Sequence, residues 1–574
     1  MSPRLLLLRR ALVRPSRSTP SLSPLASSLL VRTFAHSTAL RSNIRTRPQL
    51  PFLSSPTTTS CGTRVRYLTT ERKAKIKYDI KLGVKYTGYI WIAFGCLSLI
   101  AFVVKQESLE RQFPTPHEWT FVTRMRFRYT QDELNLNENR YVVDWVRVVQ
   151  WIKHVVTRLE DPNIDGQGVR DASPDRPPGT KDISAMPEPW RRGYYEAMML
   201  YAKAAENVDG WVVDRTRNEA FPGDTVVGPS NPNPAPLSPG TRGQPKEEDC
   251  EIAFESPNDI YLRILSTEGW TSRQRLEASL AYASWLEFKG ITGPASIVYE
   301  DAVNQTASEQ RSSPVDFKTW TLDDSAGLPS GNLLSALTAY AEFRGRHGDV
   351  SAALPIFVSI LKARRSLPAP DPNLVQNVRG SRSKAGPLAM ITSLLGPPAY
   401  PSPPDDGTAP PVRDAKEMCE EAALSLHIGE IIYTSQTASR EEGLSWTREA
   451  VDMAEEQLHK LKSSKTDRPA QHTCRDCLTA GLSNWQTMVA RLAREEAAKK
   501  EEAERPSTET AGTTTSGGGW FGLWGGAGES AVKKEDLSRW AAEEKVIQER
   551  ERRAKDLLEE LEAPASGFGA LFSA

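Results

Sequence analysis

Residues 280–303, LAYASWLEFKGITGPASIVYEDAV, and residues 338–361, TAYAEFRGRHGDVSAALPIFVSIL, are two versions of one pattern. When Ala283 is aligned with Ala341, the equivalent pairs are Tyr282 and Tyr340, Gly290 and Gly348, Ala295 and Ala353, and Tyr299 and Phe357. Two helices joined by a short glycine-containing turn give such a pattern, because small residues let the helices approach and an aromatic ring fills the space between them. The sequence therefore predicts repeated helix pairs.

These positions resemble the tetratricopeptide (TPR) signature, which has small residues at positions eight and twenty and an aromatic residue at position twenty-four. Ala302 adds the small twenty-seventh residue, and weaker units follow around Gly429 and Gly481. The eighth positions are separated by 58, 88 and 52 residues, all more than the TPR period of about 34. We expect an all-α fold: one transmembrane helix followed by a degenerate TPR-like solenoid over 255–500 with long disordered insertions, including a loop over 366–414. A generic all-α bundle is the alternative.

The TPR resemblance implies two sets of residues. The packing set comprises Tyr282, Ala283, Ala295, Tyr299, Ala302, Tyr340, Ala341, Ala353 and Phe357. The set that lines the partner-binding groove comprises Leu280, Glu287, Phe288, Glu342, Arg346, Leu426, Glu430, Tyr433, Leu478, Leu482 and Trp485. This mixture of apolar, aromatic and acidic residues suits apolar segments of unfolded or membrane proteins.

A second stretch, KYTGYIWIAFGCLSLIAFVVKQ at 85–106, contains 19 consecutive residues without charge. As a helix these residues span about 29 Å, close to the ~30 Å of a bilayer core. The preceding segment carries six basic and two acidic residues, which favours its retention on the side from which the helix inserts. We predict a transmembrane helix at 86–104 after a basic segment at 68–85, with a core helix of a soluble protein as the alternative.

The first 70 residues contain 11 Arg and no Lys, Asp or Glu. Arg-rich, Ser-rich and acid-poor composition is typical of a mitochondrial transit peptide, which we place at 1–67; a basic arm that binds nucleic acid or anionic lipid is the alternative. Without these residues the chain has 61 basic and 72 acidic residues, which argues against general nucleic-acid binding. We therefore expect an inner-membrane protein with its N-terminus in the matrix and its C-terminal domain in the intermembrane space.

The remaining segments are assigned by composition. We expect a juxtamembrane and helical region at 105–212, a Pro/Gly-rich flexible linker at 213–254, a Gly-rich disordered loop at 505–534 and a charged helix at 535–563. Arg124, Arg126 and Arg128 alternate with apolar residues, a pattern compatible with contact to anionic headgroups or with a solvated helix start. The aromatic residues of GGGWFGLWGGAG (517–528) either contact a partner or fold back onto the solenoid.

Motifs that carry chemistry are few. The chain has no phosphate-binding loop, no GxSxG and no HExxH sequence, and we expect no enzyme activity, cofactor or metal. The sequence HTCRDC contains His472, Cys474 and Cys477, but no second CxxC pair is present to complete a zinc site. We interpret Cys474 and Cys477 as small apolar residues of a helix, because residues three apart on a helix have poor geometry for a disulfide with each other.

Taken with IYLRILSTEGWTSRQRLEASLAYASWLE (260–287), the AYA repeats and the anchor, this plan resembles the fungal TPR-type adaptor subunit of the inner-membrane i-AAA protease supercomplex. The resemblance implies a non-enzymatic adaptor that binds unfolded substrates and delivers them to a membrane-bound AAA protease, together with a second adaptor subunit. A structural assembly factor or tether for an inner-membrane complex is the alternative, and an outer-membrane import receptor is a third hypothesis.

Overall fold

The structure is a computed structural model of the 574-residue chain. It describes residues 70–138, 143–172, 179–237, 243–310, 314–323, 325, 327–370, 400–435, 440–461, 468–504 and 527–562. The chain divides into two units, Met1–Trp91 and Ile92–Ala574. The predicted transit peptide, most of the expected Gly-rich loop and residues 371–399 lie outside the described residues.

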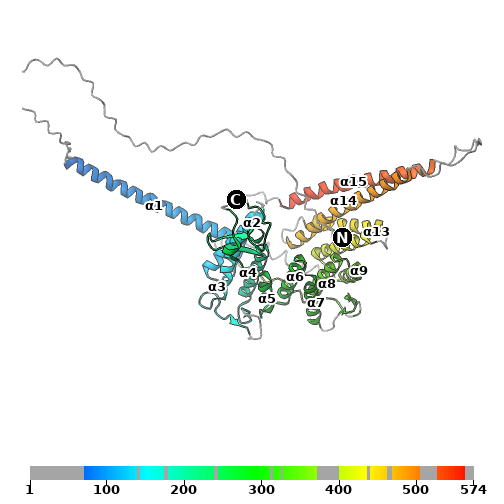
Figure 1. Cartoon of the computed structure of the whole chain (residues 1–574), viewed down its shortest axis with the longest axis horizontal. Helices are drawn as coiled ribbons and strands as arrows, with labels where there is room; N and C mark the ends of the chain where they lie inside the picture. Colours follow the sequence, from blue (N-terminus) through cyan, green and yellow to red (C-terminus); the bar gives the residue numbers. More distant parts are fainter. Residues whose placement is uncertain are drawn as a thin grey trace, which may run out of the picture. The chain divides into compact units, whose positions relative to one another are not determined.

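Helix α1 (Thr70–Gln112) contains the predicted membrane span (Figure 1). Its most apolar window has a mean hydropathy of 2.0, and none of that window is buried within the protein. A core helix of a soluble protein would be covered by other elements, whereas the apolar side chains of α1, such as Trp91, Phe94 and Leu97, are exposed. The helix is therefore long and apolar enough to cross a membrane.

The last two turns of α1 pack against α2 (Phe121–Glu138). Glu110 forms ion pairs with Arg124 and Arg128, and the buried Arg128 guanidinium also donates to Thr115 Oγ1 at 3.0 and 3.1 Å. Lys105 Nζ lies 3.0 Å from Asp132 Oδ2. Arg124 and Arg128 therefore neither contact lipid headgroups nor form a solvated helix start, as the sequence suggested, because Glu110 at the end of α1 binds them both.

The next helices are α3 (Trp145–Glu160), α4 (Glu188–Asn207) and α5 (Pro257–Ser266). Between α3 and α4, two strands of two residues each, β1 (Arg170–Asp171) and β2 (Lys181–Asp182), pair antiparallel. Asp144 caps α3 by accepting a hydrogen bond from the Arg147 amide. The apolar residues of α3 recur at helical spacing, and its buried face contributes to the core together with α4.

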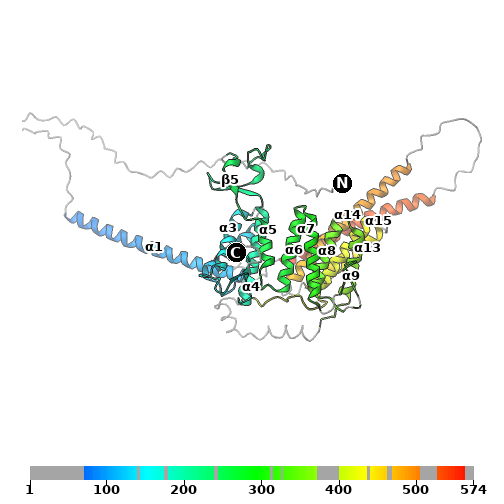
Figure 2. The same cartoon turned by 60° about the horizontal axis from the view of Figure 1, so that its bottom comes forward.

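The segment between α4 and α5 corrects the expected linker at 213–254. It forms an antiparallel three-stranded sheet in which β3 (Trp211–Asp214) pairs with both β4 (Glu219–Pro222) and β5 (Cys250–Ile252); Figure 2 shows β5 in this insertion. The β-branched run in WVVD favours a strand, and Asn218, with φ of 56°, completes the turn to β4. The proline and glycine residues of this segment lie at 222–245, in the end of β4 and the connection to β5, whereas the β3–β4 turn at 215–218 contains neither.

Two helix pairs follow, α6 (Ser272–Phe288) with α7 (Thr292–Ser308) and α8 (Gly331–Arg346) with α9 (Val350–Arg365). The two turns are alike: Gly290 and Gly348 have φ of +77° and +85°. After each glycine the next amide bonds back to the helix, Ile291 N to Leu286 O at 2.9 Å and Asp349 N to Arg344 O at 3.0 Å. This is the glycine-based helix end that reverses the chain, and α6, α7 and α8 lie side by side (Figure 2).

A short hairpin of β6 (Val315–Asp316) and β7 (Thr321–Leu322) lies between α7 and α8. Four further helices are described after α9: α12 (Ala415–Thr434), α13 (Arg440–Leu461), α14 (Arg468–Glu504) and α15 (Ala527–Glu562). Helix α15 begins eight residues before the predicted charged helix. It packs against α14, so that these two helices form the last helix pair. A Cβ atom at Gly429 of α12 would lie 2.8 Å from Gly443 O of α13, so glycine permits their close approach.

The described part of the chain is thus all-α apart from short strands, and its pairs of helices form a solenoid-like array. One hydrophobic cluster runs from α2 to α12, and a second joins α12, α13, α14 and α15. All nine packing residues predicted from the repeat are buried in the first cluster: Tyr282, Ala283, Ala295, Tyr299, Ala302, Tyr340, Ala341, Ala353 and Phe357.

Candidate functional site

Three cavities border α6: the first lies at its N-terminal half, and the second and third lie along its C-terminal half, toward α4 and toward α8 respectively. Their volumes are about 650, 950 and 500 Å³, within or near the range of ligand sites. The first and second share Tyr195, Glu196 and Glu277, and the second and third share Ser284 and Phe288. We call this set of adjoining cavities the α6 groove; α4 and α8 line it together with α6.

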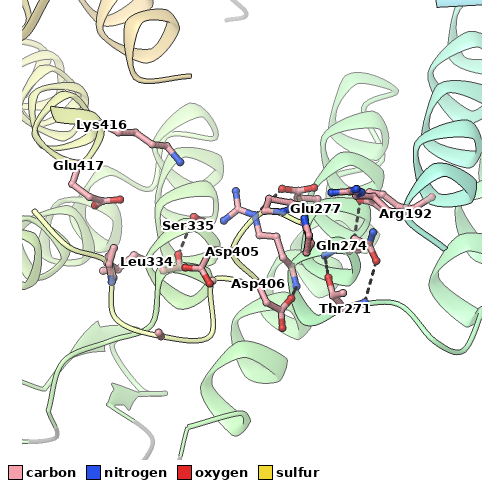
Figure 3. A pocket seen from close by; sticks show the side chains of 18 of the residues that line it. Arg192, Thr271, Gln274, Glu277, Leu334, Ser335, Asp405, Asp406, Lys416 and Glu417 are labelled. Carbon is pink, nitrogen blue, oxygen red and sulfur yellow. Dashed lines mark hydrogen bonds and ion pairs between the residues drawn. The ribbon is translucent and has the colours of Figure 1, made fainter. Parts of the chain in front are cut away.

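The first cavity is bounded by residues 400–414, a Pro-rich segment that crosses the N-termini of α6 and α8 and that we call the strap (Figure 3). The Asp406 carboxylate accepts a hydrogen bond from Arg273 N at 3.0 Å, and Gly407 O accepts one from Asn332 N at 2.9 Å. Gly331 N donates to Ala409 O at 3.1 Å. The strap thereby satisfies amides at the start of α6 and α8 that have no partner within their helices.

Only glycine fits at position 407 of the strap. Gly407 has φ of +70°, and a Cβ atom there would lie 2.2 Å from Asn332 Oδ1. The other end of the strap is held by α4, where Arg192 Nη2 donates to Pro401 O at 2.6 Å and the guanidinium lies 4.3 Å from the centre of the Tyr400 ring.

The second cavity has an apolar floor and acidic walls. Met199 and Leu200 of α4 face Trp285 and Phe288 of α6, and the Phe288 side chain is 84% exposed. The charged residues that line the cavity are Glu196, Lys203, Glu206 and Glu277. Burial in the groove wall raises the pKa of Glu196 to about 7, against the charge of Arg192, and burial also raises the pKa of Glu206.

The third cavity contains an ion-pair cluster between α6 and α8. Arg346 binds both carboxylate oxygens of Glu287, at 2.8 and 2.9 Å, and lies 3.3 Å from Glu342 Oε2. Tyr299 of α7 donates to Glu287 at 3.3 Å. Burial tends to raise the pKa of Glu287, but the hydrogen bonds and charge of Arg346 outweigh it and lower that pKa.

The cluster continues across α12 to α14. His427 Nε2 lies 3.5 Å from Glu342 and His427 Nδ1 lies 3.7 Å from Glu430, which in turn accepts a hydrogen bond from Asn484. Burial would lower the pKa of His427, but the two carboxylates outweigh it and raise the pKa to about 9. A line of charged groups, which ends at the amide of Asn484, therefore connects α6, α8, α12 and α14, the first helix of each successive pair.

Five of the predicted groove residues lie together in this site. Leu280, Glu287, Phe288, Glu342 and Arg346 all line the third cavity. They come from equivalent ends of α6 and α8, so the alignment of the two repeats places them correctly beside one another. Whether they bind a partner remains a prediction.

The other predicted groove residues need correction. Leu426, Tyr433, Leu478, Leu482 and Trp485 are buried, at most 5% exposed. Tyr433 donates to Met488 O at 3.0 Å, and Trp485 Nε1 donates to Glu543 of α15 at 2.8 Å. These side chains are covered because α12 packs directly on α14 and α15 covers α14, so they are core residues. Glu430 remains partly exposed in the line of charged groups.

The contribution of α4 was missed in the sequence. Glu196, Leu200, Lys203 and Asn207 recur at intervals of three and four, which places them on one face of α4, and all four line the second cavity. A face of mixed polar and apolar residues opposite the buried Ala197, Met198 and Tyr201 is the signal that could have identified a half-exposed wall.

The cysteines also differ from expectation. Cys474 of α14 forms a disulfide with Cys419 of α12, 55 residues away, with 5.0 Å between the Cα atoms. Cys477 is a buried free thiol, and burial raises its pKa to about 12. The interpretation of Cys474 as a simple apolar residue is therefore wrong, because its partner lies on another helix. Within the described ranges, no group of three or more His, Cys, Asp or Glu is arranged to hold a metal ion.

Comparison with known proteins gives no assignment. No protein-family model, curated protein or solved structure matches the chain significantly.

Proposed function

We propose that this protein is a single-pass adaptor of the mitochondrial inner membrane, which binds unfolded or membrane-protein segments and delivers them to a membrane-bound AAA protease. The observation that carries the proposal is the α6 groove, an open site with apolar and acidic walls, in a chain that also has a 43-residue helix with an exposed apolar stretch. A membrane anchor and a peptide-sized groove are the two parts that such an adaptor needs.

The length of the groove suits an extended peptide. Helix α6 has 17 residues, which corresponds to about 25 Å at 1.5 Å per residue. An extended chain covers this distance with about eight residues at ~3.3 Å each. The first and second cavities follow one another along α6 and can each take side chains from one such segment, and the exposed ring of Phe288 lies where the third cavity adjoins the second.

The disulfide supports the proposed compartment. Disulfides persist where the environment is oxidising and are rare in reducing compartments. Cys419 and Cys474 are both fully buried between α12 and α14, so the bond belongs to the folded interior. An oxidising side of the membrane agrees with a C-terminal domain in the intermembrane space, and the Arg-rich N-terminal residues agree with import into mitochondria.

The test uses the full-length tagged chain and two matched variants. Phe288 and Ile252 are both 84% exposed, but only Phe288 lines the groove. Phe288→Glu introduces a charge on the groove floor, and Ile252→Glu introduces the same charge on β5 outside it. Each variant is expressed in cells that lack the wild-type protein, purified from mitochondria in mild detergent, and assayed for the AAA protease and for turnover of its unfolded membrane-protein substrates.

We expect all three proteins to copurify with the protease, since neither change touches the apolar helix. Phe288→Glu should slow substrate turnover severalfold, and Ile252→Glu should leave it at the wild-type rate. Absence of an AAA protease from the wild-type preparation would reject the proposal, and unchanged turnover with Phe288→Glu would reject the groove as the substrate site. Copurification with subunits of another inner-membrane complex would instead favour the assembly factor or tether.

A further inference from the structure

Glu196 of the α6 groove is a carboxylate whose charge is not balanced by a close partner. Glu277 is paired with Arg273 at 2.7 Å, and Glu206 accepts a hydrogen bond from Tyr261 at 2.7 Å. Among the described residues, no basic side chain lies within ion-pair distance of Glu196. Its neighbour Arg192 donates to Pro401 O of the strap and lies 3.5 Å from Glu188.

Glu196 lies where two cavities meet, and apolar residues follow it along the groove. It lines both the first and the second cavity. Met199 and Leu200, one turn further along α4, and Trp285 and Phe288 on α6 line the second cavity beyond it. A ligand that reaches Glu196 with one side chain therefore places its neighbouring residues on an apolar floor.

We propose, on the basis of the function proposed above, that the α6 groove selects extended apolar segments that carry an arginine or lysine, and that this basic side chain pairs with Glu196. The charges of the groove favour such a ligand, because the second cavity is lined by Glu196, Glu206 and Glu277 against one cation, Lys203. An acidic segment would be repelled, and a wholly apolar one would cover the Glu196 carboxylate without a counter-charge.

This composition is common at the ends of membrane spans. Basic residues are enriched in the loops that remain on the insertion side, directly beside an apolar span. A segment extracted from a bilayer and unfolded would present a basic residue next to apolar ones. The proposed ligand chemistry thus agrees with membrane proteins as the substrate class.

The selectivity should depend on pH. Glu196 faces Arg192 and Glu188 on α4, Glu277 and Arg273 on α6, and Tyr400 on the strap. Because desolvation raises the pKa of Glu196, a larger share of its carboxyl groups is neutral near pH 6 than near pH 8. Preference for a basic ligand should therefore be stronger near pH 8 than near pH 6.

The experiment measures peptide binding to the full-length chain in detergent by fluorescence anisotropy. The probes are labelled peptides of about eight to twelve residues, long enough to follow α6, built from Leu, Ala and Ser. They are identical except for one central residue, which is arginine, norleucine or glutamate. The protein variants are Glu196→Gln, which keeps the shape of the side chain, Glu196→Lys, and the control Glu219→Gln, an exposed glutamate on β4 outside the groove.

We expect the wild-type chain and Glu219→Gln to bind the arginine peptide about fivefold or more tightly than the norleucine peptide, the size of one partly screened ion pair. Glu196→Gln should remove this preference without weakening norleucine binding, and Glu196→Lys should transfer it to the glutamate peptide. Binding of all peptides without an arginine preference, or a preference that survives in Glu196→Gln, would overturn the inference and leave the adaptor function intact.

Absence of binding by any peptide would overturn both the inference and the proposed function. Tighter arginine-peptide binding after removal of residues 371–399 would show that the chain itself occupies the groove, and would overturn the assignment of an external segment as the resident ligand. Peptide binding that becomes tighter as the protein is diluted would assign the groove to a second copy of the chain, which dissociates on dilution, and would overturn the inference in the same way.

Discussion

Arg346 of α8 donates two hydrogen bonds to Glu287 of α6, from Nε at 2.8 Å and from Nη2 at 2.9 Å. The two residues are 59 positions apart in the chain, yet they come from equivalent ends of two successive helix pairs. This planar, two-point contact joins the first helix of one pair to the first helix of the next. It also fixes the wall of the third cavity.

Arg346→Gln should lower the free energy of unfolding by about 0.5–1 kcal/mol near neutral pH, a modest loss because the Arg346 side chain is half exposed. The pKa of Glu287 is lowered in the folded protein. The stabilisation is therefore present above the unfolded pKa of a glutamate and is lost as the pH falls through the lower folded value. Urea unfolding across the acid range should show the wild-type and variant curves converging at low pH; a constant difference would contradict this assignment.

His427 should make the stability of the domain depend on pH in the opposite direction. Its folded pKa of about 9 lies above the ordinary histidine value of about 6.5. Its contribution is complete below the lower value and disappears as the pH rises through the higher one. The difference in melting temperature between wild type and His427→Gln should shrink from about pH 6.5 to pH 9. The same difference at both ends of the range would show that His427 is not held charged by Glu342 and Glu430.

The Cys419–Cys474 disulfide should contribute about 4 kcal/mol to stability, the value expected for closing a loop of 55 residues in the unfolded chain. Cys419→Ser should lower the unfolding midpoint strongly under oxidising conditions and little in the presence of a reductant. Cys250→Ser is the control, because Cys250 is a free thiol on β5. Alkylation of the denatured wild-type chain with a maleimide reagent before and after reduction should reveal two additional thiols; full labelling without reduction would contradict the bond.

Gly429→Val should destabilise the contact of α12 with α13 by about 1–3 kcal/mol, as overpacking in a core does. A Cβ atom there meets Gly443 O at 2.8 Å and Thr447 Oγ1 at 2.9 Å. Gly293→Ala provides the comparison, because Gly293 lies in α7 with nothing within 4 Å of an added Cβ. We expect Gly293→Ala to leave stability equal or slightly higher in thermal unfolding. Equal melting temperatures for Gly429→Val and wild type would argue against the close approach.

The sequence predicted those features whose cause is local. Gly290 and Gly348 lie in equivalent turns, because the residue that ends each helix has a positive φ, which glycine tolerates. The alignment of the two repeats places these glycines at the same position. The 19 uncharged residues before Lys105 produce a helix without buried contacts. Leu280 and Phe288 were assigned correctly to the cavity wall since both repeats have short, similar turns.

Other features depend on partners that are distant in the chain. Trp485 was predicted to face a groove, but its indole bonds Glu543 of α15, 58 residues later. The spacing of Cys474 and Cys477 argues against a disulfide between these two residues, but the disulfide partner of Cys474 is Cys419 on another helix. The proline and glycine content of residues 213–254 predicts a flexible linker, although β3, β4 and β5 pair there into a sheet. No local pattern reports such pairings.

The strap offers a route for protein engineering. Pro368 O accepts a hydrogen bond from Arg413 N at 2.9 Å, and Arg192 holds Tyr400 and Pro401, so the chain is fixed to the folded domain on both sides of residues 371–399. Sequence introduced between two fastened points leaves the contacts that fasten them in place. A fluorescent reporter or an affinity tag introduced there should therefore leave the helix pairs undisturbed, and would give a labelled protein with both termini unchanged.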